Sequence, residues 1–164
     1  MENVSEHDIE LYPPASFKTL LDHEVNRSRR YGQPLTLLDL TFETKPADPQ
    51  AQHNAEVFTI NVLNLRLRDT DIPCKKDKEF LVLMPSTDEQ GGRSACERLE
   101  KLFQVEPQTY DRVSFTLSAF IGMVTLPGDR SLSGQALIQN ASQALQYARD
   151  NRLMNTVIFS ELKH

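Results

Sequence analysis

The sequence lacks the features of several common protein classes. No stretch approaches the roughly 18 apolar residues of a membrane-spanning helix, and the acidic start MENVSEHDIE lacks the basic and then apolar order of a signal peptide. Basic residues are not in excess either, because the formal net charge is −5. This balance argues against a general DNA or RNA binder, which needs a surplus of phosphate-neutralising cations. We therefore expect a cytoplasmic protein that does not itself insert into a membrane.

Cysteine is scarce, and its placement excludes two kinds of site. Cys74 and Cys96 show neither a CxxC pair nor a Cys/His spacing typical of zinc ligands. Two isolated cysteines also make no disulfide framework, so we expect a reduced, intracellular protein. Both are predicted to be small buried apolar side chains, and no metal is expected.

The 164 residues are enough for one domain with a real core. Residues 1–14 form a polar lead and 15–160 the folded core. Apolar periodicity and capping residues predict helices over 16–30, 51–66 and 88–103, and a last one from Ser131 or Ser133 to 149. Apolar or alternating runs predict strands over 34–42, 71–75, 79–85, 112–126 and 155–159. The segment ETKPADPQ, 43–50, is predicted to be a loop. This order favours an α/β (α+β) sandwich, with helices flanking a mostly antiparallel sheet of about five strands.

Glycine is missing at the sharp turn where it is most expected. The stretch CKKDKEF, 74–80, joins two predicted strands, and its tip carries three lysines and an aspartate. Lysines at an exposed hairpin are an ordinary device against edge-to-edge aggregation. A patch that binds phosphate or a partner is the alternative interpretation.

Longer segments carry a family resemblance. The order of elements, with EVNRSRRYGQPLTLLDLTF, EFLVLMPSTDEQGGRSACERL, SFTLSAFIGMV and QALQYARDNRLMNTVIF, resembles the GGDEF domain of diguanylate cyclases along nearly the whole chain. The resemblance implies a single degenerate GGDEF domain over 1–164 with the palm-like fold of nucleotidyl cyclases. In that family the hairpin tip holds Gly-Gly-Asp/Glu-Glu-Phe, whereas here it reads KDKEF, 76–80.

The substitutions at the tip remove what a cyclase needs there. Lys76 and Asp77 fill the two glycine positions, where a Cβ blocks the approach of a nucleotide to the backbone. Lys78 stands where the family has an acid that binds metal, and a cation repels that metal. Since nothing now approaches a nucleotide at this turn, we expect that its backbone need not adopt the conformation reserved for glycine.

The first strand and the chain end depart from the family as well. The family's Asp-x-Asp pair corresponds to Thr41 and Glu43, or to Asp39 and Thr41 if the strand is two residues shorter, so only one acid remains. FETKPADPQ stands where the family has a Phe-Lys-x-x-Asn-Asp segment. Near the chain end, the family has a Lys-x-x-x-Arg-Asn motif. Here Arg149 stands for its lysine, and its arginine is absent. The resemblance therefore implies a domain without catalytic residues.

A second site of the family is retained. There the product, cyclic di-GMP, binds at an Arg-x-x-Asp motif shortly before the hairpin tip, and Arg68 and Asp71 match it. The family's further arginine, eighteen residues after the signature phenylalanine, is Arg98. Guanidinium groups suit guanine O6 and N7 and phosphates, and Asp71 suits the guanine N1 and N2 hydrogens. Arg27 lies where some members reach across to a neighbour's ligand.

Simpler interpretations of these residues remain open. Arg68 and Asp71 also suit a solvated helix terminus, where arginine complements the helix dipole and aspartate stabilises a turn. Arg98 suits an exposed helix face, and Arg27 a solvated basic face with Arg29 and Arg30.

The sequence thus predicts a non-catalytic cyclic di-GMP receptor with Arg68, Asp71, Arg98 and Arg27 at its ligand site and no cofactor. The ligand is expected as an intercalated dimer, and the output as an interaction with an unidentified protein partner or a second copy. Control of exopolysaccharide or biofilm formation is what the resemblance to degenerate receptors suggests. The alternative is a ligand-free pseudo-enzyme scaffold or interaction module. An active cyclase with unusual metal ligands is opposed by Lys78 and the missing glycines.

Overall fold

The structure is a computed structural model that describes residues 11–104, 108–110, 113–127 and 132–162. Its helices and strands alternate in the order expected from the sequence, with one additional short strand, β4. They are α1 (Pro14–Tyr31), β1 (Leu35–Lys45), α2 (Pro49–Arg66), β2 (Ile72–Lys76), β3 (Glu79–Pro85), α3 (Glu89–Phe103), β4 (Gln108–Tyr110), β5 (Val113–Leu126), α4 (Gly134–Asp150), β6 (Val157–Ile158) and a closing 3-10 turn, Phe159–Glu161.

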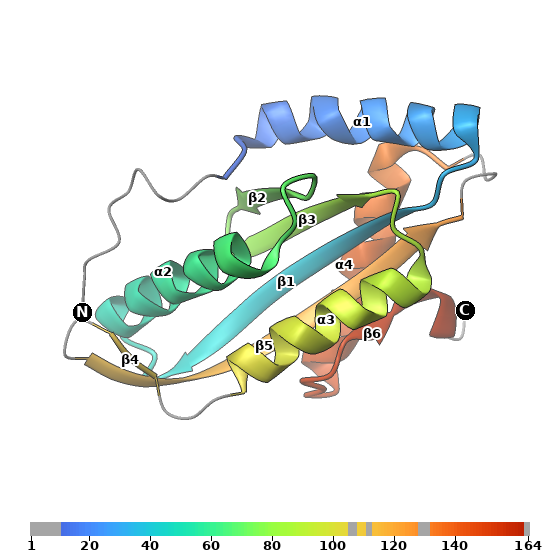
Figure 1. Ribbon diagram of the computed structural model, residues 1–164. Coiled ribbons are helices and arrows are strands. Elements are labelled where there is room, and N and C mark those ends of the chain that lie inside the picture. Colours follow the sequence, from blue (N-terminus) through green and yellow to red (C-terminus); the bar gives the residue numbers. More distant parts are fainter. Residues whose placement is uncertain (1–10, 105–107, 111–112, 128–131, 163–164) are drawn as a thin grey trace.

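The strands form one sheet in the order β2-β3-β1-β5-β4, and β6 lies beside β5 (Figure 1). All pairs are antiparallel except β5 with β6. The long central pair runs from Leu35 opposite Leu126 to Lys45 opposite Thr116. The predicted α/β sandwich with a mostly antiparallel sheet is therefore confirmed.

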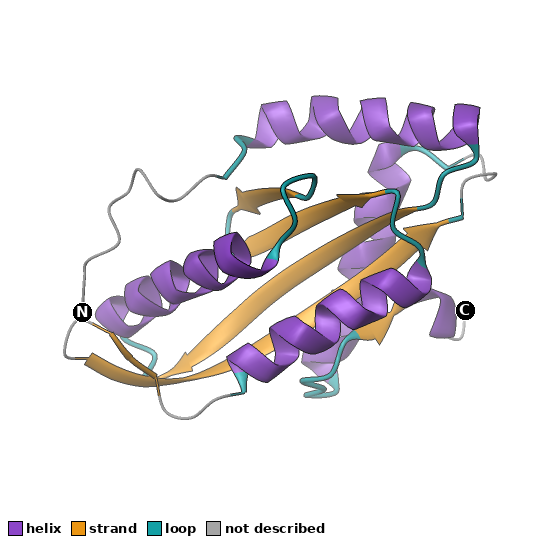
Figure 2. Cartoon of the chain, viewed as in Figure 1, coloured by secondary structure: helices purple, strands orange, loops and turns teal. Residues whose placement is uncertain are grey.

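Helices cover both faces of the sheet, with α2 and α3 in front and α4 behind in the view of Figure 2. Because successive side chains of a strand point to opposite faces, β1 contributes to both layers. Leu38 and Leu40 pack with residues of α2 and α3, whereas Leu35 and Leu37 pack with residues of α1 and α4. This double burial explains why the first strand reads as an apolar run rather than as an alternation.

Polar side chains fix where three of the helices begin. Asp88 accepts a hydrogen bond from the Gly91 N–H at 2.8 Å, as expected for the N-cap of α3. Asp48 caps α2 in the same way, and Ser133 caps α4. Ser133 is therefore the residue that opens the last helix, while Ser131 lies outside the described residues.

The predicted bounds were wrong in several places. Helix α2 begins at Pro49 rather than at Ala51, and β6 spans only Val157–Ile158 of the predicted 155–159. Helix α1 begins at Pro14 and not after Ser16, because a proline at the first helical position loses no helical hydrogen bond. Residues 43–45, predicted to be loop, extend β1 through Lys45, because they pair with β5. Strand β4 spans only three residues and gave no pattern in the sequence.

Cys74 and Cys96 are both free and buried, as predicted. Burial raises the pKa of Cys96 to about 12, so this thiol stays protonated at neutral pH. Within the described parts of the chain, no helix is long and apolar enough to cross a membrane.

Candidate ligand-binding site

The link between α2 and β2 folds into a tight polar turn. The Asp71 N–H donates to the Arg68 carbonyl oxygen at 2.9 Å, and the Arg68 N–H donates to Asp71 Oδ2, also at 2.9 Å. The carboxylate thus satisfies a backbone donor just beyond the end of α2, in the way that aspartate commonly stabilises turns. The Asp71 side chain is only 3 % exposed, so it is a structural part of the turn.

The Arg68 side chain extends from this turn toward the start of α3. Its guanidinium donates to Thr87 Oγ1 at 2.5 Å and lies 3.5 Å from Asp71 Oδ1. Thr87 Oγ1 in turn donates to the Pro85 carbonyl oxygen at 2.9 Å. The Arg68 side chain nevertheless remains 56 % exposed, so the group is oriented but still accessible.

Arg98 reaches the same place from the middle of α3. A cavity of about 210 Å³ between the Arg68 turn and α3 is lined by Arg68, Asp71 and Arg98 together. Arg98 is exposed and makes no ion pair with any residue that the structure describes. Three residues singled out from the sequence are therefore brought together, two from one loop and one from a helix.

Four polar or small residues at this cavity had not been predicted from the sequence: Arg66, Thr87, Gly91 and Ser94. Arg66, at the end of α2, is a third arginine at this cavity. The signal for it in the sequence was its position two residues before Arg68. Thr87 and Ser94 gave no signal, because only the fold brings the β3–α3 connection against the end of α2.

Arg27 does not lie at this cavity. It projects from α1, where its guanidinium lies 3.4 Å from Glu24 in an exposed ion pair. Helix α1 packs with α4 in the other helical layer, while α3 lies on the opposite face of the sheet. Within one chain Arg27 therefore contacts none of the other three predicted site residues.

The hairpin that replaces the family signature is a two-residue turn between β2 and β3. Asp77 has φ 57, which lies in the left-handed region. The turn therefore still uses, at Asp77, a conformation that glycine favours, although it does not require glycine. Aspartate is among the few residues that adopt this conformation readily, since its short polar side chain can bond locally.

Strand β1 faces this hairpin with one hydroxyl and one buried acid. Thr41 Oγ1 donates to the Lys78 carbonyl oxygen at 3.0 Å, so Thr41 binds the turn. Asp39 is 1 % exposed, and its Oδ1 has no hydrogen-bond partner among the described residues. Burial, and secondarily the charge of Glu79, raises the pKa of Asp39 to about 8. Glu43 lies farther along and pairs with Arg152 at 2.8 Å.

The fold and the sites described above place the chain in a known class of protein. The family model "Diguanylate cyclase, GGDEF domain" matches residues 58–155, more than half of the chain. The chain therefore belongs to the GGDEF domain family. A curated relative, the diguanylate cyclase DgcP of Pseudomonas aeruginosa, is 28 % identical in an alignment of 141 residues that covers 82 % of this chain. The match covers 21 % of that longer protein, so the chain spans about a fifth of its relative's length.

Solved structures show the same fold at low sequence identity. The GGDEF domain of PA1120 (YfiN or TpbB) from P. aeruginosa has a TM-score of 0.79 and 18 % identity, with 92 % of this chain and 97 % of that chain covered. The diguanylate cyclase SiaD with its activator SiaC, also from P. aeruginosa, gives 0.80 and 20 %, covering 92 % and 60 %. DgcB from Caulobacter crescentus, solved in complex with c-di-GMP, gives 0.74 and 12 %, covering 93 % and 84 %.

Proposed function

We propose that this GGDEF domain is a non-catalytic receptor that binds cyclic di-GMP at the cavity between the Arg68 turn and α3. The observation that carries the proposal is that Arg68 and Arg98, thirty positions apart in the sequence, line one cavity with Asp71. Two arginines at one concave surface suit a ligand with two phosphates and two guanine bases. That DgcB has been solved with this dinucleotide supports the choice of ligand within the family.

The contacts assign different roles to the three residues. Arg98 is exposed and without an ion pair among the described residues, so it can form charge-assisted hydrogen bonds with a phosphate or with guanine O6 and N7. Arg68 can do the same if its guanidinium keeps or exchanges its bond to Thr87. Asp71 faces Arg68 rather than the solvent, so it acts first as a positioning residue for the turn and for Arg68.

The size of the cavity sets the mode of binding. About 210 Å³ is below the range of roughly 300–1,000 Å³ typical of pockets that enclose a drug-sized ligand. A dinucleotide would therefore rest on this surface with one part inserted, leaving its other face free. A stacked, intercalated dimer of the ligand can then present a second recognition face to a protein partner or to a second copy of the domain.

The non-catalytic part of the proposal is supported by the donor set at the former signature. Divalent magnesium requires carboxylate, carbonyl or water oxygens. Here Lys78 supplies a cation, Thr41 is bonded to the turn, and the pKa of about 8 leaves Asp39 mostly protonated at neutral pH. These residues do not fit a metal-bound triphosphate, and the side chains of Lys76 and Asp77 occupy the positions of the family's glycines.

A second function has a specific observation in its favour. Arg68 already has partners in Thr87 and Asp71, so the Arg-x-x-Asp match can serve the fold alone. The domain would then be a ligand-free scaffold for protein interaction. The two functions differ in one measurable property, which is binding of the dinucleotide.

Isothermal titration of the purified domain with cyclic di-GMP tests the proposal, with GTP as a control ligand. We expect saturable binding near micromolar Kd, weakened at least about tenfold by Arg98→Ala and by Arg68→Ala, since each lost charge-assisted bond costs on the order of 1.5–3 kcal/mol. Arg93→Ala is the matched control, because Arg93 is an exposed arginine of the same helix that does not line the cavity. About two ligands per domain would indicate the stacked dimer.

Two results would contradict the receptor function. One is the absence of binding by folded wild-type protein, which leaves the scaffold as the supported function. The other is binding that Arg93→Ala weakens as much as Arg98→Ala does, because the contact would then be general electrostatic attraction rather than this cavity.

A further inference from the structure

The cavity between the Arg68 turn and α3, which we call the Arg68 cavity, carries an excess of positive charge. The charged residues that line it are three arginines and one aspartate, with a formal charge of +2: Arg66, Arg68, Arg98 and Asp71. The chain as a whole has a formal net charge of −5, so this surface is opposite in sign to the protein average. Asp69 and Asp88 lie near in the sequence but do not line the cavity, and Asp88 is bonded to the Gly91 N–H. The cavity therefore attracts anions.

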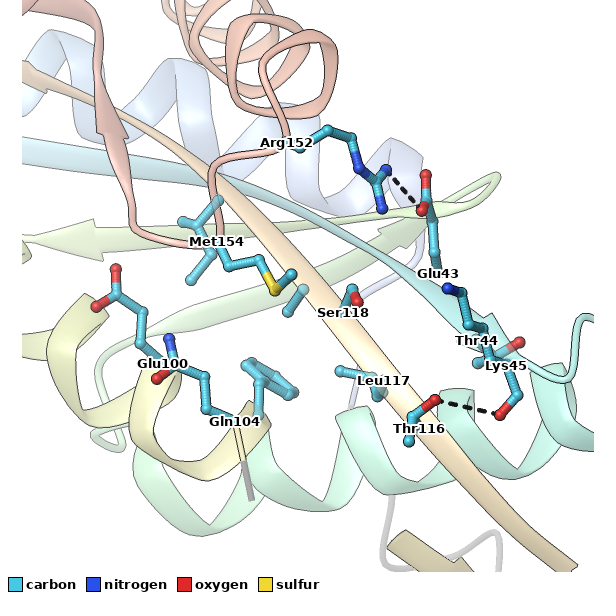
Figure 3. Close-up of a pocket in the computed structure, with 13 residues that line it drawn as sticks. Glu43, Thr44, Lys45, Glu100, Gln104, Thr116, Leu117, Ser118, Arg152 and Met154 are labelled. Atoms are coloured by element: carbon cyan, nitrogen blue, oxygen red, sulfur yellow. Dashed lines mark hydrogen bonds and ion pairs between the residues drawn. The ribbon is translucent and has the colours of Figure 1, made fainter. Parts of the chain in front are cut away.

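The larger cavity beside β5, of about 340 Å³, is balanced in charge (Figure 3). Its charged lining residues are Glu43, Lys45, Glu100 and Arg152. Glu43 pairs with Arg152 at 2.8 Å, and Glu100 accepts hydrogen bonds from the backbone N–H and the hydroxyl of Thr156. Of these two cavities, only the Arg68 cavity has cationic charge without a matching number of acids.

Arg66 is directed to the Arg68 cavity by the residue that follows it. Leu67 ends α2 with an extended backbone, φ −79 and ψ 152, and its side chain packs against the core beneath α2 and α3. Since successive side chains of an extended segment point to opposite sides, the residues before and after Leu67 project away from the core. Arg66 and Arg68 are accordingly both exposed and both line the cavity.

Arg66 and Arg68 differ in the contacts that already hold them. The Arg68 guanidinium donates to Thr87 and lies beside Asp71. Arg66 makes no ion pair with any residue that the structure describes, and the same is true of Arg98. A guanidinium held in one orientation suits the paired O6 and N7 acceptors of a guanine edge. A guanidinium without a partner suits a phosphate, which needs a positive charge more than one fixed orientation.

We propose that Arg66 is a further ligand-binding residue of this site and that it binds a phosphate of the dinucleotide from the end of α2, while Arg98 binds from α3. This inference rests on the proposed receptor function and extends it to a position outside the Arg-x-x-Asp motif. The two phosphodiesters of one cyclic di-GMP molecule carry two negative charges, which equal in number the formal charge of +2 on the cavity lining.

Isothermal titration with cyclic di-GMP tests the role of Arg66 by comparing alanine and lysine substitutions. Arg66→Ala should weaken binding about tenfold, because one charge-assisted hydrogen bond is lost. Arg66→Lys should stay within about threefold of the wild type, because lysine binds phosphate as a point charge. Arg68→Lys should instead lose about tenfold or more, because lysine lacks the planar fork that binds a guanine edge.

Arg30→Ala is the matched control. Arg30 is an exposed arginine on α1 that makes no ion pair with any described residue and does not line the Arg68 cavity. Its replacement removes the same unit of charge from the protein, so its effect measures general electrostatic attraction and should stay below about twofold. Urea unfolding of each variant shows that a change in affinity does not come from loss of the fold.

The outcomes separate this inference from the receptor function. The absence of binding by folded wild-type protein overturns both. Binding by the wild type that Arg66→Ala weakens no more than Arg30→Ala does overturns the role of Arg66 and leaves the receptor function standing. Equal losses in Arg66→Ala and Arg66→Lys overturn the phosphate contact, because the site would then need the guanidinium fork at this position rather than its charge.

Discussion

Asp39 and Arg68 are two ionisable residues in opposite environments, one buried and one exposed. Arg68 is oriented by two partners and remains accessible, which is what a ligand-binding side chain requires. Asp39 is enclosed in the sheet, with one carboxylate oxygen unpaired among the described residues. A buried carboxyl without partners is stable only in its neutral form, so the folded state favours the protonated acid.

Asp39→Asn tests this protonation. The unfolded chain releases the Asp39 proton above about pH 4, whereas the folded chain holds it up to about pH 8. Rising pH between these values therefore lowers the free energy of unfolding of the wild type, by at most about 1.4 kcal/mol per pH unit. The Asp39→Asn variant lacks the titrating carboxyl, so its stability does not fall for this reason. We expect the stability of the variant relative to wild type to increase from about pH 5 to pH 8 and then to level off, measured by urea unfolding.

Asp69→Asn provides the control for this pH dependence, because it removes an exposed carboxylate near the end of α2. Its unfolding curve should keep the pH dependence of the wild type. Parallel curves for wild type and Asp39→Asn would mean that Asp39 is ionised in the folded protein.

Strand β5 and helix α4 pack at the distance set by one glycine. A Cβ on Gly122 would lie 2.3 Å from the Leu145 backbone nitrogen and 2.4 Å from the Ala141 carbonyl oxygen. These are backbone atoms of a helix and cannot move aside singly. Gly122 therefore fixes how closely α4 lies on the sheet.

Gly122→Ala should destabilise the whole domain. Because α4 must shift outward as a unit, we expect a loss of about 1–3 kcal/mol or more, seen as a lower urea midpoint with an unchanged denaturant slope. Gly91→Ala is the comparison, since its nearest contact is a side-chain methyl, Thr87 Cγ2, at 3.1 Å. It should change stability by less than about 1 kcal/mol, because alanine also favours the helix. Equal effects of the two substitutions would refute this role of Gly122.

For the whole molecule, the remaining question is whether a GGDEF fold without its signature retains turnover. The chain has the fold of its relatives, and we propose that Lys78 and Thr41 stand at the positions of metal ligands. A shared fold does not establish shared turnover, because function resides in the site rather than in the fold.

Incubation with GTP and magnesium or manganese tests the proposed absence of turnover. The products are analysed by chromatography, and we expect no more cyclic di-GMP than in a protein-free blank. The protein is taken from the same preparation that binds added cyclic di-GMP in the titration. The reason is electrostatic, since a lysine at a metal position disfavours the cation that catalysis requires. A positive control with an active diguanylate cyclase confirms the assay. Product formation by this chain would instead establish an active cyclase with unusual metal ligands.

Much of the fold follows from local patterns in the sequence. The caps at Asp88 and Ser133 and the β2–β3 hairpin were predictable because each depends on neighbours within a few residues. The extension of β1 to Lys45 and the short β4 were not, because both depend on pairing with β5. Long-range hydrogen bonds override the local preference of a polar segment for a loop.

The candidate sites, too, were predictable from the sequence only in part. The residue types at the hairpin tip and the Arg68–Asp71 spacing are properties of the sequence alone, since a missing glycine or carboxylate is missing in any conformation. Only the tertiary structure placed Arg98 and Thr87 beside Arg68, put Arg27 away from this cavity within one chain, and buried Asp39. These outcomes depend on which helices cover which face of the sheet. Such properties arise from packing between segments far apart in the chain, so no local pattern of residues contains them.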